Sequence, residues 1–379
     1  MRIIVISQDV GVSAVGIVAE RLLVELSKIC EVDLVVSNYN PELTISVKKL
    51  FRLKRKSIHY KVDRWLFDIF GTDLFAEAIK KKIILQNEYD YILSIGANGQ
   101  YYGLLIGAFL HKKYKIRWAN YFVDAIPAPI GWSKNNLHYK RTSRLIQKTL
   151  REVDLLASVN QEMLDYQKKM FKNKSTMKSV VLLPPAPSTH IKELKPSSNN
   201  YYRFLYAGNI YGKRTSAFII AAFEELYKEI SNVELIFVGS ALMSVVEERC
   251  KYGVDVQNQI KTLPFANDLE PYYKDATALI DIDANVDNDI FLSSKMPGYL
   301  SYNRPIICET GINSPSRRLF SNLKTVIQCD HNKNELKNAM IATIKKANDY
   351  DYSERQVILN QFNACNIARK LYNLMQENK

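Results

Sequence analysis

The stretch RFLYAGNIYGKRTSAFIIAAFEEL, residues 203–226, decides the fold. It begins with a short apolar run that ends in Gly208, and from about Ser216 it has the apolar spacing of a helix that continues to Ile230. A second apolar run, VELIFVG (233–239), follows directly. Strand, helix and strand in this order predict a βαβ unit, which is the building block of a parallel sheet covered by helices.

The same alternation continues on both sides of that stretch. Downstream, the runs TALIDI (277–282) and RPIICE (304–309) complete a doubly wound domain. Upstream, the predicted strands are 3–6, 32–36, 91–96, 116–123 and 154–159, and helix-length segments separate them. The sequence therefore predicts an α/β protein with two Rossmann-like doubly wound domains that face each other across a cleft.

A stretch rich in Pro, Ser and Asn, residues 182–200, predicts the connection between the domains. We expect an N-terminal domain at 1–185, a C-terminal domain at 200–352 and a terminal segment at 353–379. Apolar residues recur at helical spacing through that segment, so it is predicted to be one amphipathic helix, and packing back onto the first domain is one option for it.

Composition excludes several classes of protein. Hydrophobic residues make up 47% of the chain, which is enough for real cores and too much for a disordered protein. The five cysteines form no CxxC pair and the five histidines show no metal-ligand spacing, so we expect neither a disulfide framework nor a metal. No run reaches the about 18 apolar residues of a membrane span, and no signal peptide is recognisable. We expect a cytoplasmic protein, acting either freely or at the inner face of the membrane.

The net charge of +13 is concentrated in the first half of the chain. Residues 1–190 hold 29 Lys and Arg against 17 Asp and Glu, a balance of +12, which leaves only +1 for the remainder. This asymmetry is expected if the first half alone faces an anionic partner.

The segment KKLFRLKRKSIHYK (48–61) contains seven Lys or Arg and no acidic residue, and RWLF (64–67) follows it. Cations mixed with leucine and aromatic residues suit an anionic lipid surface. A plain charged helix face is the alternative. No recognisable RNA- or DNA-binding module accompanies the charge, so we expect no nucleic-acid partner. The predicted membrane-surface residues are Lys48, Lys49, Arg52, Lys54, Arg55 and Lys56.

Lys213 and Arg214 lie in the loop between Gly208 and the predicted helix start. Cations and free backbone N–H groups at the start of a helix form a suitable site for a diphosphate, and Arg can donate to two phosphate oxygens at once. Lys295 would add a flexible point charge. Together these cations can stabilise the charge on a departing nucleoside diphosphate. The alternative is an ordinary solvated surface beside a helix.

The stretch 206–226 with LIFVGS (235–240), followed by DIFLSSKMPGYLSYNRPIICET (289–310), resembles the large retaining family of GT-B glycosyltransferases that includes many bacterial polysaccharide enzymes. In that family a later segment of the form SKxxxYLxxxRPI surrounds the nucleotide. The resemblance implies a retaining, metal-independent transfer of a sugar from a nucleotide-sugar to a carbohydrate or lipid-linked oligosaccharide acceptor. Cell-surface polysaccharides such as lipopolysaccharide or capsule are the implied products, and no cofactor is implied beside the donor substrate.

The resemblance also implies the residues of the site. The donor-binding set is Gly208, Asn209, Gly239, Phe265, Ser293, Ser294 and Tyr299. The catalytic set is Asp124, Lys213, Arg214 and Lys295. Phe265 has two interpretations, because it can stack on the nucleobase or belong to the core.

The chain departs from the family at two positions. Asn209 stands where the family often has Arg, and Gly298 stands where it has the second of two glutamates, the first falling near Asp289 or Ile290. Two alternatives therefore stay open. One is a degenerate GT-B protein that acts as a non-catalytic binding or assembly subunit, and the other is a GT-B-like nucleotide-sugar epimerase or hydrolase.

The acceptor site is expected in the first domain. In WANYFVDAIPAPIGW (118–132), a predicted strand runs into Asp124 and a proline-containing loop, at the sheet edge where ligands of such folds gather. Asp124 is a candidate to bind acceptor hydroxyls or assist their deprotonation, and capping of the following turn is the alternative. Gly11 and Trp132 complete the predicted acceptor set, although an ordinary turn also explains Gly11.

The run DIDANVDND (281–289) contains four acidic residues. It lacks the Gly and the terminal Glu of a calcium-binding loop. It is predicted to be a solvated loop at the end of a strand.

Overall fold

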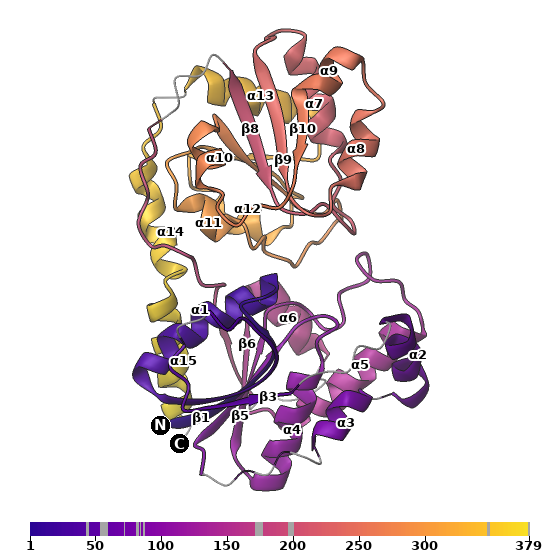
Figure 1. The fold of residues 1–379 in the computed structure, drawn as a ribbon, viewed down its shortest axis with the longest axis vertical. Helices are drawn as coiled ribbons and strands as arrows, with labels where there is room; N and C mark the ends of the chain where they lie inside the picture. The colour runs from indigo at the N-terminus through magenta and orange to yellow at the C-terminus, as the bar shows by residue number, and fades with distance from the viewer. Residues whose placement is uncertain are drawn as a thin grey trace. The chain divides into compact units, whose positions relative to one another are not determined.

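The computed structural model describes residues 1–42, 45–53, 60–71, 73–80, 83, 85, 88–170, 177–195, 201–346 and 349–377. The chain forms two compact units, Met1–Ala186 with Gln361–Lys379, and Pro187–Asn360 (Figure 1). Each unit is an α/β structure with one parallel sheet, as the sequence predicts. Across the described residues, every helix is too short or too polar to span a bilayer.

The first unit is built on a parallel sheet with the strand order β3-β2-β1-β4-β5-β6-β7. These strands are β1 (Arg2–Val10), β2 (Glu31–Tyr39), β3 (Lys49–Arg52), β4 (Tyr91–Gly96), β5 (Arg117–Phe122), β6 (Leu155–Ser158) and β7 (Lys178–Val181). Its helices are α1 (Ala14–Ile29), α2 (Tyr60–Phe70), α3 (Leu74–Lys80), α4 (Tyr102–Tyr114), α5 (Leu137–Thr149), the 3-10 turn η1 (Leu150–Glu152), and α6 (Gln161–Lys169).

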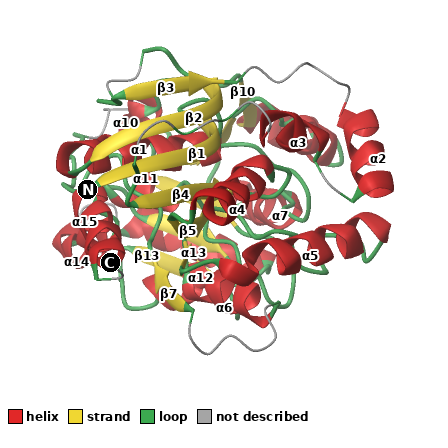
Figure 2. Ribbon diagram, turned by 90° about the horizontal axis from the view of Figure 1, so that it is seen from below, coloured by secondary structure: helices red, strands yellow, loops and turns green. Residues whose placement is uncertain are grey.

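The handedness of the connections places the helices of the first unit on both faces of its sheet. From β1 the chain moves outward to β2 and β3, and from β4 it moves the opposite way to β7. Right-handed crossovers in opposite directions put their helices on opposite faces. Figure 2 accordingly shows α1 on one side of the strands and α4 with α2, α3 and α5 on the other. The central strands are therefore buried on both faces, as β4 is along its whole length.

The second unit has a six-stranded parallel sheet with the order β10-β9-β8-β11-β12-β13. Its strands are β8 (Tyr202–Ala207), β9 (Val233–Val238), β10 (Ile260–Leu263), β11 (Ala278–Ile282), β12 (Ile306–Glu309) and β13 (Val326–Cys329). Its helices are α7 (Ala217–Tyr227), α8 (Met243–Arg249), α9 (Val254–Gln259), α10 (Glu270–Asp275), α11 (Met296–Leu300), α12 (Pro315–Phe320) and α13 (Lys333–Lys345). The core lies between this sheet and α7 with α13, where Phe204, Phe223 and Phe237 are fully buried.

The terminal segment differs from its prediction as a single helix. It consists of the 3-10 turn η2 (Tyr352–Arg355), α14 (Gln356–Gln361) and α15 (Ala364–Gln376). The break falls at Asn363, which has an extended backbone and accepts a hydrogen bond from the backbone N of Asn366, so it caps a new helix. Helix α15 packs against α1 in the first unit and buries Ile367, Leu371 and Met375.

Candidate functional site

The second unit changes winding direction between β8 and β11. These strands are neighbours, yet the chain leaves β8 toward β9 and leaves β11 toward β12. The loops that follow the two strands therefore diverge, and ligands of open α/β sheets bind at such a point, outside the carboxyl ends of the strands. Gly208 follows β8 directly, and Asp281 and Asp283 lie at the end of β11, so all three lie at this point.

Lys295 is held at this point by a network of polar groups. Its Nζ lies 3.2 Å from Oδ1 of Asp281, and Ser293 donates to the same oxygen at 2.7 Å. The ammonium also lies 4.8 Å from the centre of the Tyr206 ring. Burial lowers the pKa of Lys295, but Tyr206 and Asp281 raise it by more, so the net shift is upward and the side chain is charged.

Two glycines permit the close approach of these loops. Gly208 has a φ of +142°, and a Cβ there would lie 2.7 Å from Cε of Lys295. A Cβ at Gly239, after β9, would lie 2.4 Å from the backbone oxygen of Gly208. Gly239 therefore excludes a side chain through a backbone contact, whereas at Gly208 the positive φ disfavours one and the Lys295 side chain would have to shift. Gly208 and Gly239 were predicted as donor-binding residues, and this role stays a prediction; the structure shows only the space that they leave.

Asn209 joins the loop after β8 to the loop after β9. Its Oδ1 accepts hydrogen bonds from the backbone N of Ser240 at 2.8 Å and of Ala241 at 2.9 Å. The side-chain oxygen of Asn209 is therefore already hydrogen-bonded within the protein. Arginine, which the resembling family often has here, could not accept these two bonds.

Arg214 lies close to the same carboxylates as Lys295. Its guanidinium is 5.8 Å from the centre of the Tyr211 ring. Burial lowers the pKa of Arg214, whereas Tyr206, Asp281 and Asp283 raise it by more, so the net shift is upward. Arg214 and Lys295 thus share Tyr206 and Asp281 as electrostatic neighbours, and the charge of Arg214 lowers the pKa of Lys295 in part. Lys213, by contrast, has an exposed side chain.

The acidic run 281–289 corrects its prediction as a solvated loop. Asp281, Asp283 and Asp289 are all buried, and only Asp287 of the four is exposed. Among the described residues, neither carboxylate oxygen of Asp283 has a hydrogen-bond partner. Burial, followed by the charges of Asp281 and Asp289, raises the pKa of Asp283 well above its ordinary value. The environment of Asp283 therefore favours its neutral form over the carboxylate.

The remaining donor-set residues differ in exposure. Ser294 is exposed, whereas Ser293 is buried against Asp281. Tyr299 is buried, and its hydroxyl accepts from the backbone N of Ala207 at 2.8 Å, so it holds the end of β8.

Phe265, in the loop after β10, is 67% exposed, which rules out its interpretation as a core residue. Gly298 lies in α11, and a Cβ there would meet nothing within 4 Å.

The predicted acceptor residues lie in loops that follow two strands of the first unit. Gly11 follows β1 with a φ of +76°, and its backbone N donates to the oxygen of Gly16 at 2.9 Å. Asp124 follows β5 and is partly buried, and Trp132 lies in the same loop, its backbone N bonded to the oxygen of Pro129. Parallel strands place both loops at the carboxyl edge of the sheet, with the end of β4 between them.

Sequence reasoning missed Asp9 in this region. Its Oδ1 accepts from the backbone N of Val12 at 3.1 Å and of Ser13 at 3.2 Å, and it occupies the space that a Cβ at Gly16 would take. Asp9 therefore shapes the turn after β1. An aspartate directly before a Gly-containing turn was the available signal.

The predicted membrane-surface set lies only partly within the described residues. Lys48, Lys49 and Arg52 are exposed, the last two on β3, the edge strand of the first sheet. The alternative of a charged helix face is therefore wrong for Lys49–Arg52, which form a strand. Lys54, Arg55 and Lys56 lie outside the described residues.

Comparison with solved structures shows the fold. The chain matches HepE of Anabaena in complex with UDP-glucose, with a TM-score of 0.73, 12% identity and 100% coverage of both chains. It matches sucrose-phosphate synthase of Thermosynechococcus elongatus with a TM-score of 0.68, 15% identity and coverage of 100% and 98%. No family model matches the sequence, and no curated protein does. The chain shares the GT-B fold with these structures.

The same fold also occurs in an enzyme of another class. A Listeria monocytogenes protein named as a UDP-N-acetylglucosamine 2-epimerase matches with a TM-score of 0.58, 12% identity and coverage of 100% and 96%. The fold therefore does not by itself choose between sugar transfer and epimerisation. Within the part of the chain that is described, no group of three His, Cys, Asp or Glu side chains is arranged to hold a metal ion.

Proposed function

We propose that the chain is a glycosyltransferase whose second unit binds a nucleotide-sugar and whose first unit presents the acceptor. The observation that carries the proposal is the position of Lys295 and Arg214, two charged side chains beside Asp281 at the switch point of the second sheet. A diphosphate is the anion that two adjacent cations at such a point accommodate best.

Each residue of the donor site has a role in this proposal. Lys295 and Arg214 hold the diphosphate and stabilise the charge that it gains when the sugar departs. Exposed Lys213 and Ser294 donate to its outer oxygens. The start of α7 adds backbone N–H groups beyond that of Ala217, which donates to Oγ1 of Thr215 at 3.2 Å, since Ser216 makes no side-chain cap. Phe265, which is exposed at the carboxyl end of β10, stacks on the nucleobase.

The acceptor is a carbohydrate or a lipid-linked oligosaccharide of a cell-surface polysaccharide pathway. Asp124 binds its hydroxyl group or assists the loss of the proton, as its place in the loop after β5 allows. Transfer retains the anomeric configuration and requires no metal ion. Resemblance of 206–226 and 289–310 to retaining GT-B enzymes supports this part of the proposal.

The test uses the full chain with a panel of UDP-, GDP- and dTDP-sugars, with thermal shift for binding and chromatography of the sugar and nucleotide for turnover. Transfer to a bacterial membrane extract, unchanged by EDTA and lost in Lys295→Met, is the expected result. The matched control Lys345→Met alters an exposed lysine on α13 and should keep full activity.

The other outcomes distinguish the alternatives. Conversion of the donor without any acceptor favours an epimerase or hydrolase, as the shared fold of the Listeria protein permits. Donor binding without turnover in the presence of extract favours a binding subunit. If none of the nucleotide-sugars binds, the proposal is wrong.

A further inference from the structure

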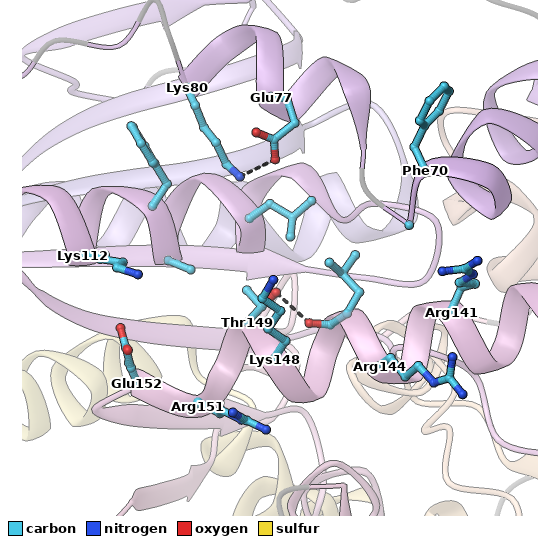
Figure 3. A pocket seen from close by; sticks show the side chains of 15 residues that line it. Phe70, Glu77, Lys80, Lys112, Arg141, Arg144, Lys148, Thr149, Arg151 and Glu152 are labelled. Carbon is cyan, nitrogen blue, oxygen red and sulfur yellow. Dashed lines mark hydrogen bonds and ion pairs between the residues drawn. The ribbon is translucent and has the colours of Figure 1, made fainter.

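A basic hollow lies in the first unit, away from the loops described above, between α2, α3, α4 and α5. Its volume is about 720 Å³, and Phe70 and Gly71 at the end of α2 form part of its wall. The cationic side chains around it come from α3, α4, α5 and η1 (Figure 3). Of the described residues, six cations line it, against the two carboxylates Glu77 and Glu152: Lys80, Lys112, Arg141, Arg144, Lys148 and Arg151.

Among the residues that the structure describes, most of this positive charge has no ion-pair partner. Lys80 pairs with Glu77 at 2.6 Å. For the other five cations, the described residues contain no ion pair, and Nε of Arg141 is buried without a hydrogen-bond partner. Arg141, Arg144 and Lys148 follow one another at helical spacing, which places them on one face of α5. A row of unpaired like charges raises the energy of the free protein and is relieved when an anion binds.

An exposed apolar helix face borders the hollow. Helix α2 is anchored by Phe67, whose ring lies 5.3 Å from that of His138 on α5, and by Asp68, which bonds His138 at 2.8 Å. The opposite face of α2 is left to solvent, with Trp65 60% exposed and Ile69 47% exposed. Phe70, at 59%, belongs both to this face and to the wall of the hollow.

We propose that this surface docks the protein on an anionic phospholipid membrane. The α2 face, defined as Val62, Trp65, Ile69 and Phe70, enters the interface between headgroups and acyl chains, and the hollow receives the phosphates of the lipids beside it. Tryptophan at an interface next to unpaired Lys and Arg is the combination that anionic lipid surfaces select.

The apolar face decides between this partner and other anions. A soluble phosphate or a nucleic-acid backbone would be held by the cations alone and would leave Trp65 and Ile69 in water. A lipid surface accounts for both features at once. The inference is independent of the proposed transferase activity, because docking requires neither donor nor acceptor.

The experiment measures flotation of the full chain with vesicles of phosphatidylcholine alone or mixed with phosphatidylglycerol. Binding is expected to the mixed vesicles and not to the neutral ones, and to weaken as salt rises. Arg144→Glu with Lys148→Glu should weaken it about tenfold or more, and so should Trp65→Ser with Ile69→Ser. All four side chains are exposed, so the fold should persist, which circular dichroism checks.

Matched controls lie in the second unit. Lys345→Glu with Lys346→Glu makes the same charge change at exposed positions. Met243→Ser with Val254→Ser removes two apolar side chains that are 70% and 71% exposed. Both control variants should float with the mixed vesicles like the unaltered chain. Equal flotation with neutral vesicles, or unaltered flotation of both test variants, overturns the proposal. Tight binding of a DNA oligonucleotide that is lost in the Arg144 variant but kept in the Trp65 variant also overturns it, in favour of a nucleic-acid site.

Discussion

Lys295 and Asp281 form a buried ion pair that joins the start of α11 to the end of β11, with Nζ and Oδ1 3.2 Å apart and side-chain exposures of 14% and 0%. Removing one partner of such a pair leaves an uncompensated buried charge. Each charge of the pair therefore depends on the other for the stability of the fold, in addition to the anion binding proposed for Lys295.

Lys295→Met separates these two contributions when it is combined with Asp281→Asn. The single variant should lose about 3 kcal/mol of unfolding free energy, and the double variant should regain most of that loss, because neither charge then remains. Binding of UDP should be lost in both. Urea unfolding and titration calorimetry are the measurements, and recovery of UDP binding in the double variant would contradict direct contact between Lys295 and the nucleotide.

Gly208→Ala should destabilise the second unit by about 1–3 kcal/mol, since alanine at φ +142° is strained and its Cβ would lie 2.7 Å from Cε of Lys295. Gly253→Ala is the matched control. Gly253 has a φ of −63° and open space around its Cβ position. Its substitution should change the unfolding free energy by less than about 0.5 kcal/mol. Equal effects of the two substitutions in urea unfolding would show that the approach of Lys295 does not constrain Gly208.

Asp283→Asn should change how stability depends on pH. The pKa of Asp283 is raised in the folded protein, so above pH about 4 the unfolded chain releases a proton that the folded chain keeps. Stability of the unaltered protein then falls as pH rises, by about 1.4 kcal/mol per pH unit, until the folded pKa is passed. Asp283→Asn has no carboxyl group to titrate at this position, so it lacks this loss. The difference in unfolding free energy between the variant and the unaltered protein should therefore grow in favour of the variant as pH rises.

The control for this series is Asp351→Asn. Hydrogen bonds from Ser353 lower the pKa of Asp351, which is exposed. A lowered pKa gives stability that is lost only as pH falls, so this variant should gain no advantage as pH rises. Parallel stability curves for Asp283→Asn and the unaltered protein would mean that Asp283 is ionised in the fold.

Gly298→Glu should be accepted by the fold, because a Cβ there meets nothing within 4 Å and Gly is a poor helix residue. A carboxylate at this position would accept hydrogen bonds from ribose hydroxyls, so affinity for a nucleotide-sugar should rise about tenfold. Gly298→Gln has similar size without the charge. Calorimetric titration should show the gain with Glu and a smaller one with Gln. If the unaltered protein and both variants bind the nucleotide-sugar with the same affinity, Gly298 lies away from the ribose.

Much of the fold was predictable from local pattern. Strands β4, β9 and β11 were each predicted to within one residue at either end, because a strand buried on both faces is a continuous apolar run. The sequence also singled out Lys295 and Arg214, and their role in donor binding stays a prediction. Their common neighbour Asp281 was missed, although its position inside the apolar run TALIDI distinguished it from a solvated residue.

Other features depend on tertiary neighbours that no local pattern contains. Asp283 is buried by residues that are distant in sequence. Asp287 and Asp289 are also aspartates in the same run, yet the first is exposed and the second is buried, so residue type does not predict exposure here. The cations of the basic hollow come from α3, α4, α5 and η1, so their convergence appears only when the helices are packed. Asn363 is a helix-capping residue type, so it could have signalled a new helix inside the terminal segment. The apolar residues recur at helical spacing on both sides of it, which favoured the prediction of a single helix.

The packing of α15 on α1 has a consequence for biosynthesis. Helix α1 leaves the ribosome before the whole second unit, and its partner α15 follows that unit. Until α15 emerges, the face of α1 that it covers stays exposed in the nascent protein, where chaperones can bind it, and the first unit is completed only after the second has been made.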